Sequence, residues 1–244
     1  MPASPQTADA NPGGLRTVDL CRNYELGGNI VRAVADVTLQ VEAGEFAALL
    51  GTSGSGKSTL LGLLAGMDKA TSGSITVAGT TLADLSRNDL AAYRLHTVGM
   101  IFQSFNLIGT MTLLENVELP LRFAGVDRKQ REPLAREALG RVGLTDRVHH
   151  RPNELSGGQQ QRGAIARAII NHPKVLFADE PTGNLDSRTG IEIMELIRGL
   201  NQSEGMTVMM VTHEPHLAER YANRILHMAD GQLLTENRPA ETQA

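Results

Sequence analysis

Three short apolar runs stand out along the chain, at residues 46–50, 175–178 and 207–211. Continuous apolar runs of this length are typical of β-strands that are covered on both faces, as in a parallel sheet. Each run is followed at once by polar residues. Since ligands of open α/β sheets bind beyond the carboxyl ends of the strands, the pattern predicts a functional site where these runs end.

Helical patterns lie between the apolar runs, at residues 60–65, 162–170 and 190–200. The first continues from a glycine-rich turn, the second is rich in Ala and Ile, and the third has apolar residues at helical spacing. Alternation of strand and helix predicts an α/β fold built on a parallel sheet.

The rest of the chain predicts additions to this core. Residues 18–41 and 73–82 have the pattern of strands and turns, and residues 103–151 carry helical patterns with many Arg and Glu. The predicted divisions are a disordered leader over 1–14, an α/β core over 15–102 and 163–235, an inserted α-helical subdomain over 103–162 and a flexible tail over 236–244.

Composition narrows the class of protein. Hydrophobic residues make up 41% and charged residues 20%, as in ordinary soluble globular proteins. The net charge of −4 argues against a general nucleic-acid binder, which would carry a basic excess. The single cysteine, Cys21, leaves no internal disulfide and no Cys-rich metal site. The N-terminus lacks the features of a secretory signal and no run approaches about 18 apolar residues, so we expect a cytoplasmic protein.

Residues 51–59 fit the phosphate-loop pattern G-x-x-x-x-G-K-[ST] between a predicted strand and a predicted helix. Glycines let successive backbone N–H groups point at phosphate oxygens, and the helix that begins near Lys57 adds its positive dipole end. Lys57 supplies a positive charge for the β and γ phosphates, and the Ser58 hydroxyl is a ligand for Mg²⁺. The candidate nucleotide-binding residues are Gly51, Ser53, Gly54, Ser55, Gly56, Lys57, Ser58 and Thr59.

An acidic pair follows the second apolar run. Asp179 stands where a carboxylate would hold Mg²⁺, and Glu180 can reach a water near the γ-phosphate as a general base. The alternative is a surface acidic pair that merely ends a strand. The complete phosphate loop upstream favours the catalytic interpretation.

A second helix start combines a serine with two glycines at Ser156, Gly157, Gly158 and Gln159. Ser156 is a good N-cap, and a helix N-terminus with glycines suits an anion. Since one nucleotide already has its phosphate loop, this helix start is interpreted as serving a nucleotide held by another copy of the chain. The alternative is a capped helix start with no ligand.

In its motifs the chain resembles the nucleotide-binding subunit of ATP-binding-cassette (ABC) transporters from about residue 15 to residue 235. The phosphate loop, LSGGQ at residues 155–159 and the strand ending in Asp179 and Glu180 come in the order of that family. The resemblance implies a P-loop NTPase core of the RecA-like type with an antiparallel β subdomain. It also implies ATP and Mg²⁺ as cofactors, a head-to-tail dimer, an integral membrane permease as partner, no nucleic acid, and a peripheral place at the cytoplasmic face of the membrane.

Four further residues match the family by position. Gln103 resembles the glutamine that contacts Mg²⁺ and the attacking water, and Asp186 resembles the aspartate that communicates across the dimer. His213 resembles the histidine that contacts the γ-phosphate, and Tyr24 stands where an aromatic ring stacks on adenine. The alternatives are a solvated strand end for Gln103, a residue at a helix start for His213 and a cap on the apolar sheet edge for Tyr24.

Within the family, residues 102–107, 114–121 and 181–186 are similar to the ATPases of macrolide-exporter, lipoprotein-release and cell-division-associated complexes. The apolar residues Phe105 and Leu107 are expected to be exposed and to meet a coupling helix of the membrane partner; the alternative is that they pack inside the helical lobe. Gly163 stands within a helix, where glycine costs about 1 kcal/mol relative to alanine.

Other function classes fit less well. Ribosome-associated factors usually carry two cassettes in one chain, and a DNA-repair ATPase would need sustained heptads between its motifs. A small-molecule kinase should lack the LSGGQ motif that stands at residues 155–159 of this chain. A regulatory ATPase of the cell-division type that moves no cargo remains an alternative to an ATPase that drives transport.

Overall fold

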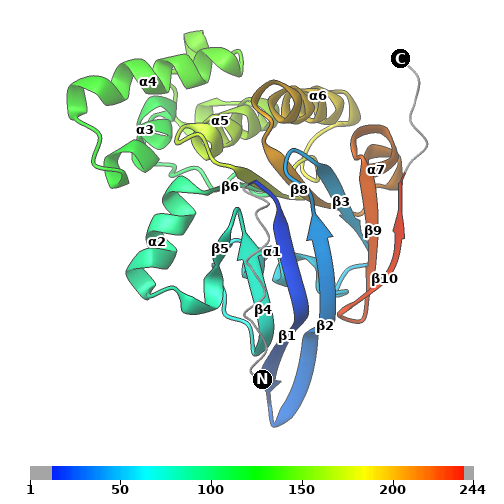
Figure 1. The fold of residues 1–244 in the computed structure, drawn as a ribbon. Coiled ribbons are helices and arrows are strands. Elements are labelled where there is room, and N and C mark those ends of the chain that lie inside the picture. The colour runs from blue at the N-terminus through cyan, green and yellow to red at the C-terminus, as the bar shows by residue number, and fades with distance from the viewer. Residues whose placement is uncertain (1–12, 239–244) are drawn as a thin grey trace.

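The computed structural model describes residues 13–238, and its strands form two sheets (Figure 1). The larger sheet has six strands in the order β10-β9-β3-β8-β7-β6, and the smaller has four in the order β2-β1-β4-β5. The strands are β1 Leu15–Leu26, β2 Asn29–Val41, β3 Phe46–Leu50, β4 Ser72–Val77, β5 Thr80–Thr81, β6 Val98–Phe102, β7 Val175–Asp179, β8 Thr207–Thr212, β9 Arg224–Ala229 and β10 Gln232–Asn237.

Seven α-helices and three single 3₁₀ turns complete the part of the chain that the structure describes. The helices are α1 Lys57–Leu64, α2 Arg87–His96, α3 Leu113–Phe123, α4 Arg128–Arg141, α5 Gly157–Ile169, α6 Ser187–Glu204 and α7 Pro215–Tyr221. The 3₁₀ turns are Leu82–Asp84, Thr145–Arg147 and Pro152–Glu154.

The three predicted apolar strands are neighbours at the centre of the larger sheet. β3 pairs with β8 and β8 with β7, all parallel, so that Met210 lies opposite both Ala48 and Ala178. Every residue of β3 and β8 is buried, because helices cover one face of this sheet and the smaller sheet covers the other. The predicted α/β fold with a parallel sheet is confirmed, and the carboxyl ends of the three strands share one edge.

The smaller sheet is entirely antiparallel, as predicted for a β subdomain. Its apolar residues Leu20, Val37 and Val77 share one core cluster with α1 and with Ala47 and Leu49 of the larger sheet. The helix that follows the phosphate loop therefore lies between the two sheets (Figure 1).

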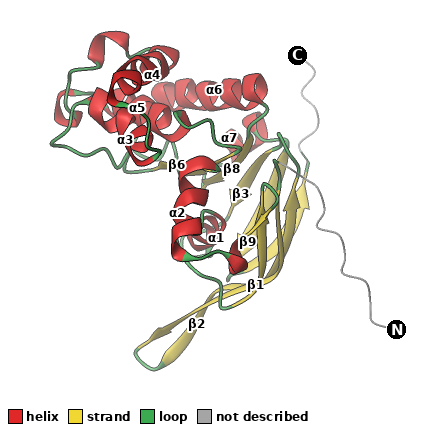
Figure 2. Ribbon diagram, turned by 60° about the vertical axis from the view of Figure 1, so that its left-hand side comes forward, coloured by secondary structure: helices red, strands yellow, loops and turns green. Residues whose placement is uncertain are grey.

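Helices α3 and α4 form a lobe at one end of the molecule, and the long β1–β2 hairpin lies at the other (Figure 2). α5 packs both on α3 and α4 and on β6 of the large sheet. The predicted boundary between residues 162 and 163 therefore falls inside a continuous helix. The signature helix belongs to both parts because its apolar residues face the lobe and the sheet together.

The predicted ends also need adjustment. Strand β10 continues to Asn237, so residues 236 and 237 of the predicted tail pair with β9 in the sheet. At the other end, the carbonyls of Gly13 and Gly14 accept hydrogen bonds from Thr207 and Ala78. Residues 1–12 of the predicted leader and residues 239–244 of the predicted tail lie outside the described chain. Among residues 13–238, no helix combines the length and the apolar character of a membrane span.

Candidate functional site

The phosphate loop leaves β3 and enters α1 at a place where only glycine fits two positions. A Cβ at Gly51 would lie 2.2 Å from the carbonyl oxygen of Met228, and a Cβ at Gly56 would lie 2.1 Å from that of Ala33. Gly56 also has a φ of +99°, in the region that favours glycine. The loop is therefore wedged against β2 and β9, which fixes its shape.

The Lys57 side chain folds back into the loop and is almost fully buried. Its Nζ donates to the carbonyl oxygens of Gly51 at 2.8 Å and Thr52 at 2.7 Å, and to Ser55 Oγ at 3.3 Å. Burial lowers the pKa of the Lys57 ammonium, and the nearby charges of Glu180 and Asp179 oppose this shift. The positive charge thus stands inside the loop, close to both carboxylates.

Ser58 and Asp179 present two oxygen ligands side by side. Ser58 Oγ donates to Asp179 Oδ1 at 3.1 Å. Burial raises the pKa of Asp179, while the hydrogen bond from Ser58 opposes the shift. A hydroxyl and a carboxylate that is unfavourably buried fit Mg²⁺, because this cation prefers oxygen ligands and would neutralise the charge.

Glu180 and His213 meet at the ends of the adjacent strands β7 and β8. His213 Nδ1 lies 3.3 Å from Glu180 Oε1. Glu180 has a φ of +47°, which is uncommon for a residue other than glycine, and its N–H donates to the carbonyl of Val211 at 2.9 Å. Such strained backbone persists where the surroundings hold it, and it is concentrated at functional sites. The predicted place of both residues at one sheet edge is confirmed.

Gln103 follows β6 and lies against the segment after Glu180. Asn184 Nδ2 donates to the Gln103 carbonyl at 2.9 Å, and a Cβ at Gly183 would lie 2.7 Å from Gln103 Nε2. β6 pairs with β7 so that Phe102 is opposite Asp179. The structure thus brings Gln103 to the same edge as the acidic pair.

The signature segment has the geometry of a capped helix start. Ser156 Oγ accepts a hydrogen bond from the Gln159 N–H at 3.3 Å, and Gln159 Oε1 accepts one from the Ser156 N–H at 2.9 Å. A Cβ at Gly158 would lie 2.5 Å from Thr189 Cγ2, and one at Gly157 would lie 3.2 Å from the Leu185 side chain. Gly158 is thus required by close packing on the start of α6, and Gly157 lies close to the segment just before it, contacts that the sequence did not reveal.

Asp186 has a structural task of its own as the N-cap of α6. Its carboxylate accepts from the Thr189 N–H at 3.0 Å and from Thr189 Oγ1 at 2.6 Å. The hydrogen bond from the Thr189 side chain, together with those from the backbone, lowers the pKa of Asp186. Since Thr189 also touches Gly158, the start of α6 connects Asp186 to the signature segment.

Tyr24 belongs to a polar cluster rather than to an apolar sheet edge. Its hydroxyl donates to Asp68 Oδ2 at 2.6 Å, and the Arg22 guanidinium lies 4.4 Å from the ring centroid. Arg22 is also paired with Asp68 at 2.9 Å. The residues that fix the ring, Arg22 and Asp68, were not identified from the sequence because their strands and loops meet only in the fold.

The expected exposure of Phe105 and Leu107 in the helical lobe was wrong. Leu107 is half-buried and packs against the core of the lobe, and Phe105 is half-buried with its ring 3.7 Å from the Cβ position of Gly157. Gly163 has a packing role in α5, because a Cβ there would lie 2.4 Å from Leu113 Cδ1. This glycine lets α3 approach α5.

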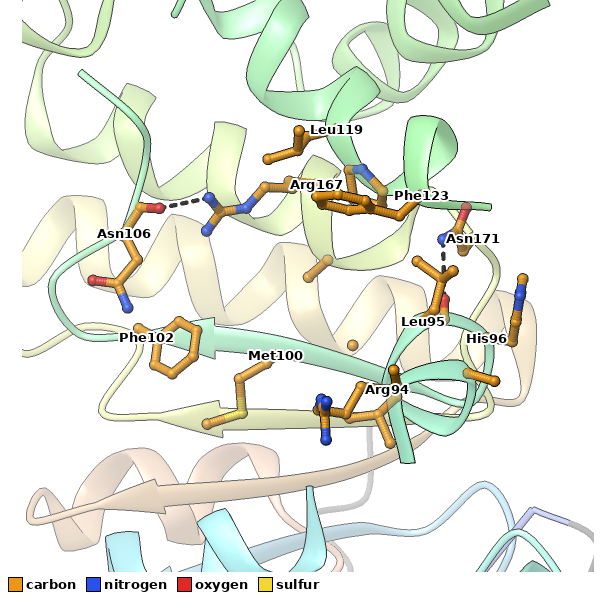
Figure 3. Close-up of a pocket in the computed structure, with 16 residues that line it drawn as sticks. Arg94, Leu95, His96, Met100, Phe102, Asn106, Leu119, Phe123, Arg167 and Asn171 are labelled. Carbon is orange, nitrogen blue, oxygen red and sulfur yellow. Dashed lines mark hydrogen bonds between the residues drawn. The ribbon is translucent and has the colours of Figure 1, made fainter. Parts of the chain in front are cut away.

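A groove with a volume of about 920 Å³ lies beside this segment, between α2, β6, α3 and α5 (Figure 3). Met100, Phe102, Leu119 and Phe123 give it an apolar lining, and Phe123 is 71% exposed. Arg167 crosses one end and donates to the carbonyls of Asn106 and Phe105. Burial lowers the pKa of Arg167.

Comparison with known proteins agrees with this geometry. The ABC transporter family pattern matches residues 34–183. A macrolide export ATP-binding/permease protein of Bradyrhizobium diazoefficiens is 47% identical over 90% of this chain, which spans 33% of that protein. An uncharacterized ABC transporter ATP-binding protein of Methanocaldococcus jannaschii is 48% identical over 83% of this chain and 89% of its own length.

A solved structure shows the same fold. The ATP-binding cassette MJ0796, in a dimeric post-hydrolysis state bound to ADP and Pi, is 40% identical and superimposes with a TM-score of 0.85 over 93% of this chain and 99% of its own. The phosphate loop, the paired strand ends and the capped signature helix therefore have their counterpart in a known class of protein, and the chain belongs to the ABC transporter family.

Proposed function

We propose that this chain is the ATP-hydrolysing subunit of an ABC transporter. The observation that carries the proposal is the meeting of Glu180 with His213, 3.3 Å apart, at the sheet edge that also bears the Ser58–Asp179 pair. A base, a positive charge and oxygen ligands for a cation beside a phosphate loop are the parts that phosphoryl transfer to water requires.

In this proposal the phosphates of ATP bind the loop of residues 51–59. Lys57 turns from the loop carbonyls to the β and γ phosphates, which offer its ammonium charged partners in place of neutral ones. Tyr24 stacks on the adenine, with its ring held by Asp68. Mg²⁺ would be held by Ser58, Asp179 and Gln103, where it would neutralise charge on the phosphate oxygens.

The chemical step depends on Glu180. Its carboxylate orients a water for attack on the γ-phosphorus and accepts a proton from it, since carboxylates serve as general bases when they are positioned in this way. His213 fixes the carboxylate and contacts the γ-phosphate. Lys57 stabilises the negative charge that spreads over the phosphoryl oxygens.

A second copy of the chain completes the site. Ser156 is exposed at the N-terminus of α5, where the helix dipole and free N–H groups favour an anion. We place this helix start of one copy against the γ-phosphate bound by the other. The dimeric state of the MJ0796 cassette supports the arrangement. ATP then acts as a ligand that favours the closed dimer.

The groove between α2, β6, α3 and α5 is the proposed contact with the membrane partner. The macrolide export relatives combine an ATP-binding part and a permease in one chain, and this chain matches only a third of their length. A short amphipathic helix of a permease fits an apolar groove with an exposed aromatic at its edge. The proposal therefore includes a peripheral position at the cytoplasmic face of a membrane, in an export-type complex and not as a regulatory ATPase without cargo.

Phosphate release by the purified protein tests the proposal. The wild-type chain should release phosphate from Mg-ATP, and Glu180→Gln should bind ATP but release at least about a hundredfold less, as expected when a general base is removed. The Gln variant should also accumulate as an ATP-bound dimer. Near wild-type turnover by Glu180→Gln would show that the base has been assigned wrongly.

A further inference from the structure

Gln161 is an amide side chain in the core, five residues after Ser156 on α5. It is fully buried. Its Nε2 donates to the carbonyl oxygen of Pro181 at 2.6 Å and, at the long distance of 3.5 Å, to that of Phe102. Pro181 directly follows Glu180, and Phe102 directly precedes Gln103. One side chain of the signature helix thus reaches both segments that carry the proposed catalytic residues.

The orientation of the Gln161 amide is fixed by these two acceptors. Rotating the amide by half a turn would place Oε1 against two carbonyl oxygens, which repel it. With Nε2 facing them, Oε1 is buried without a hydrogen-bond partner. An unpaired buried acceptor costs free energy. An apolar side chain of the same length would avoid that cost, but it would leave the buried Pro181 carbonyl without the Gln161 N–H. The amide at this position therefore serves to hold the Pro181 carbonyl, although its own oxygen stays unpaired.

The hydrogen bond to Pro181 can help to hold the backbone of Glu180, which is in a strained conformation. Its φ of +47° is held by its own N–H bond to Val211 on one side and by the turn in which Gly183 donates to its carbonyl at 3.1 Å. The Pro181 carbonyl is the next acceptor along the chain. Fixing that peptide restricts the torsion angles on the C-terminal side of Glu180, which set the direction of its carboxylate.

We propose that Gln161 is a positioning residue for hydrolysis, which acts by holding the Pro181 carbonyl so that the Glu180 carboxylate stays beside His213. The inference rests on the proposed ATPase function. It predicts that loss of the amide N–H lowers turnover, because the base is displaced from the attacking water while the phosphate loop is untouched. Displacements of about 1 Å in a catalytic group can cost up to a hundredfold in rate.

The first test replaces Gln161 by methionine, which has a similar length and no amide. In the full chain, Gln161→Met should lower kcat for ATP about tenfold. KM and the equilibrium affinity for ATP should stay within about twofold of wild type, since the Gln161 amide bonds to neither the phosphate loop nor Tyr24. The matched control is Gln160→Met, because Gln160 Nε2 bonds only within its own helix start, to Leu155 O at 3.1 Å. Its kcat should stay within about twofold.

The second test uses Gln161→Glu, which separates positioning from packing. A protonated glutamic acid can donate to the Pro181 carbonyl, whereas its carboxylate cannot. The ratio of variant to wild-type kcat should therefore rise as the pH is lowered from about 8 to 6. Taking the ratio at each pH removes the pH dependence of kcat that the two proteins have in common.

Three outcomes would overturn the proposal: equal kcat for Gln161→Met and wild type, an equal loss in the Gln160→Met control, or a pH-independent ratio for Gln161→Glu. A rise in KM with unchanged kcat would also overturn it, since that result indicates lost ATP binding. If the wild-type protein itself releases no phosphate, the result contradicts the proposed ATPase function and not specifically the role of Gln161.

Discussion

At the scale of single residues, Lys57 is held by hydrogen bonds to the same loop in which we propose that it binds phosphate. Its ammonium makes three hydrogen bonds to loop oxygens and is almost fully buried. A positive ammonium is attracted more strongly by negative phosphate oxygens than by neutral carbonyls, so phosphate oxygens can replace the carbonyl partners. We predict that Lys57→Ala weakens ATP binding about 30-fold or more, measured by titration with a fluorescent ATP analogue.

The control for this variant is Lys129→Ala, which removes an exposed lysine from α4. Its ATP affinity should equal that of wild type. Thermal unfolding of both variants shows whether the loop stays folded. Equal nucleotide affinity for Lys57→Ala and wild type would contradict the phosphate-loop assignment.

Asp179 is a residue for which function and stability should conflict. Burial raises the pKa of its carboxyl above the unfolded value of about 3.8, so the folded chain disfavours the ionised form. This penalty is present above the folded pKa and disappears as the pH falls toward the unfolded value. We predict that Asp179→Asn raises the melting temperature at pH 7, without nucleotide or Mg²⁺, by about 1–2 °C, since solvent screens part of the penalty.

The same variant should lose Mg²⁺-dependent ATP turnover. Its gain in melting temperature should shrink as the pH falls toward the unfolded pKa of 3.8, because the wild-type carboxyl then becomes protonated. Asp84→Asn, at an exposed carboxylate, serves as the control and should show neither effect. A lower melting temperature for Asp179→Asn at pH 7 would show that the buried charge is compensated within the protein.

At the scale of elements, the contact between α5 and α6 reverses the usual rule for glycine in a helix. Alanine in a helix interior is ordinarily more stable than glycine by about 1 kcal/mol. At Gly158 its Cβ would lie 2.5 Å from Thr189 Cγ2, and Thr189 cannot turn away without breaking its bond to Asp186. We predict that Gly158→Ala destabilises the protein by about 1–2 kcal/mol in urea unfolding.

A double variant identifies the cause of that destabilisation. Thr189→Ser removes the methyl group and keeps the hydroxyl that bonds Asp186, so Gly158→Ala combined with Thr189→Ser should recover most of the lost stability. The coupling free energy between the two positions measures the contact. Additive effects of the two substitutions would mean that the clash is relieved elsewhere.

The elements that were predicted correctly are those whose structure follows from the residues of the segment itself. Residues 46–50, 175–178 and 207–211 are apolar because both faces of the sheet are covered, and their polar ends bring Glu180 and His213 together. The misplaced boundaries at residues 162 and 235 have non-local causes. α5 packs on two parts of the molecule, and β10 is held by β9.

The residues of the candidate site also fall into two groups, those that the sequence predicted and those that only the fold reveals. The phosphate loop and the acidic pair follow from spacing along the chain. Asp68, which holds Tyr24, and Gln161, which holds Pro181, are distant in sequence from the residues that they contact. Nothing in the local pattern distinguishes an exposed glutamine from the buried Gln161, so these supporting residues become visible only in the fold.

At the scale of the whole molecule, the serine-capped helix start and the phosphate loop belong to different parts of the fold. Ser156 precedes Gly157 and Gly158, which face Phe105 and the start of α6. Lys57 instead begins α1, whose leucines pack in the core cluster shared by the two sheets. The proposed function therefore requires a second copy to bring them together. Each nucleotide then links two chains, and its hydrolysis removes the link.

Ser156→Arg tests this requirement directly. A bulky cation at the exposed helix start should block closure of the dimer while leaving the phosphate loop intact. In the Glu180→Gln background, which prevents turnover, we predict that Ser156→Arg stays monomeric in ATP by light scattering. Its ATP affinity should lie within about twofold of the affinity that the parent shows at protein concentrations too low for dimer formation, since dimer formation itself tightens ATP binding. The parent should be dimeric, since ATP is the ligand that favours the closed state.

The arginine also removes the N-cap, which is worth about 0.5–2 kcal/mol, so a second variant must separate the two effects. Ser156→Ala removes the same cap without adding bulk, and it should still dimerise with ATP, although at higher protein concentration. If Ser156→Arg dimerises as readily as the parent, the helix start does not face a neighbour's nucleotide. If Ser156→Ala is as monomeric as Ser156→Arg, the cap and not the contact surface controls closure, because loss of the serine hydroxyl alone then suffices to keep two ATP-loaded chains apart.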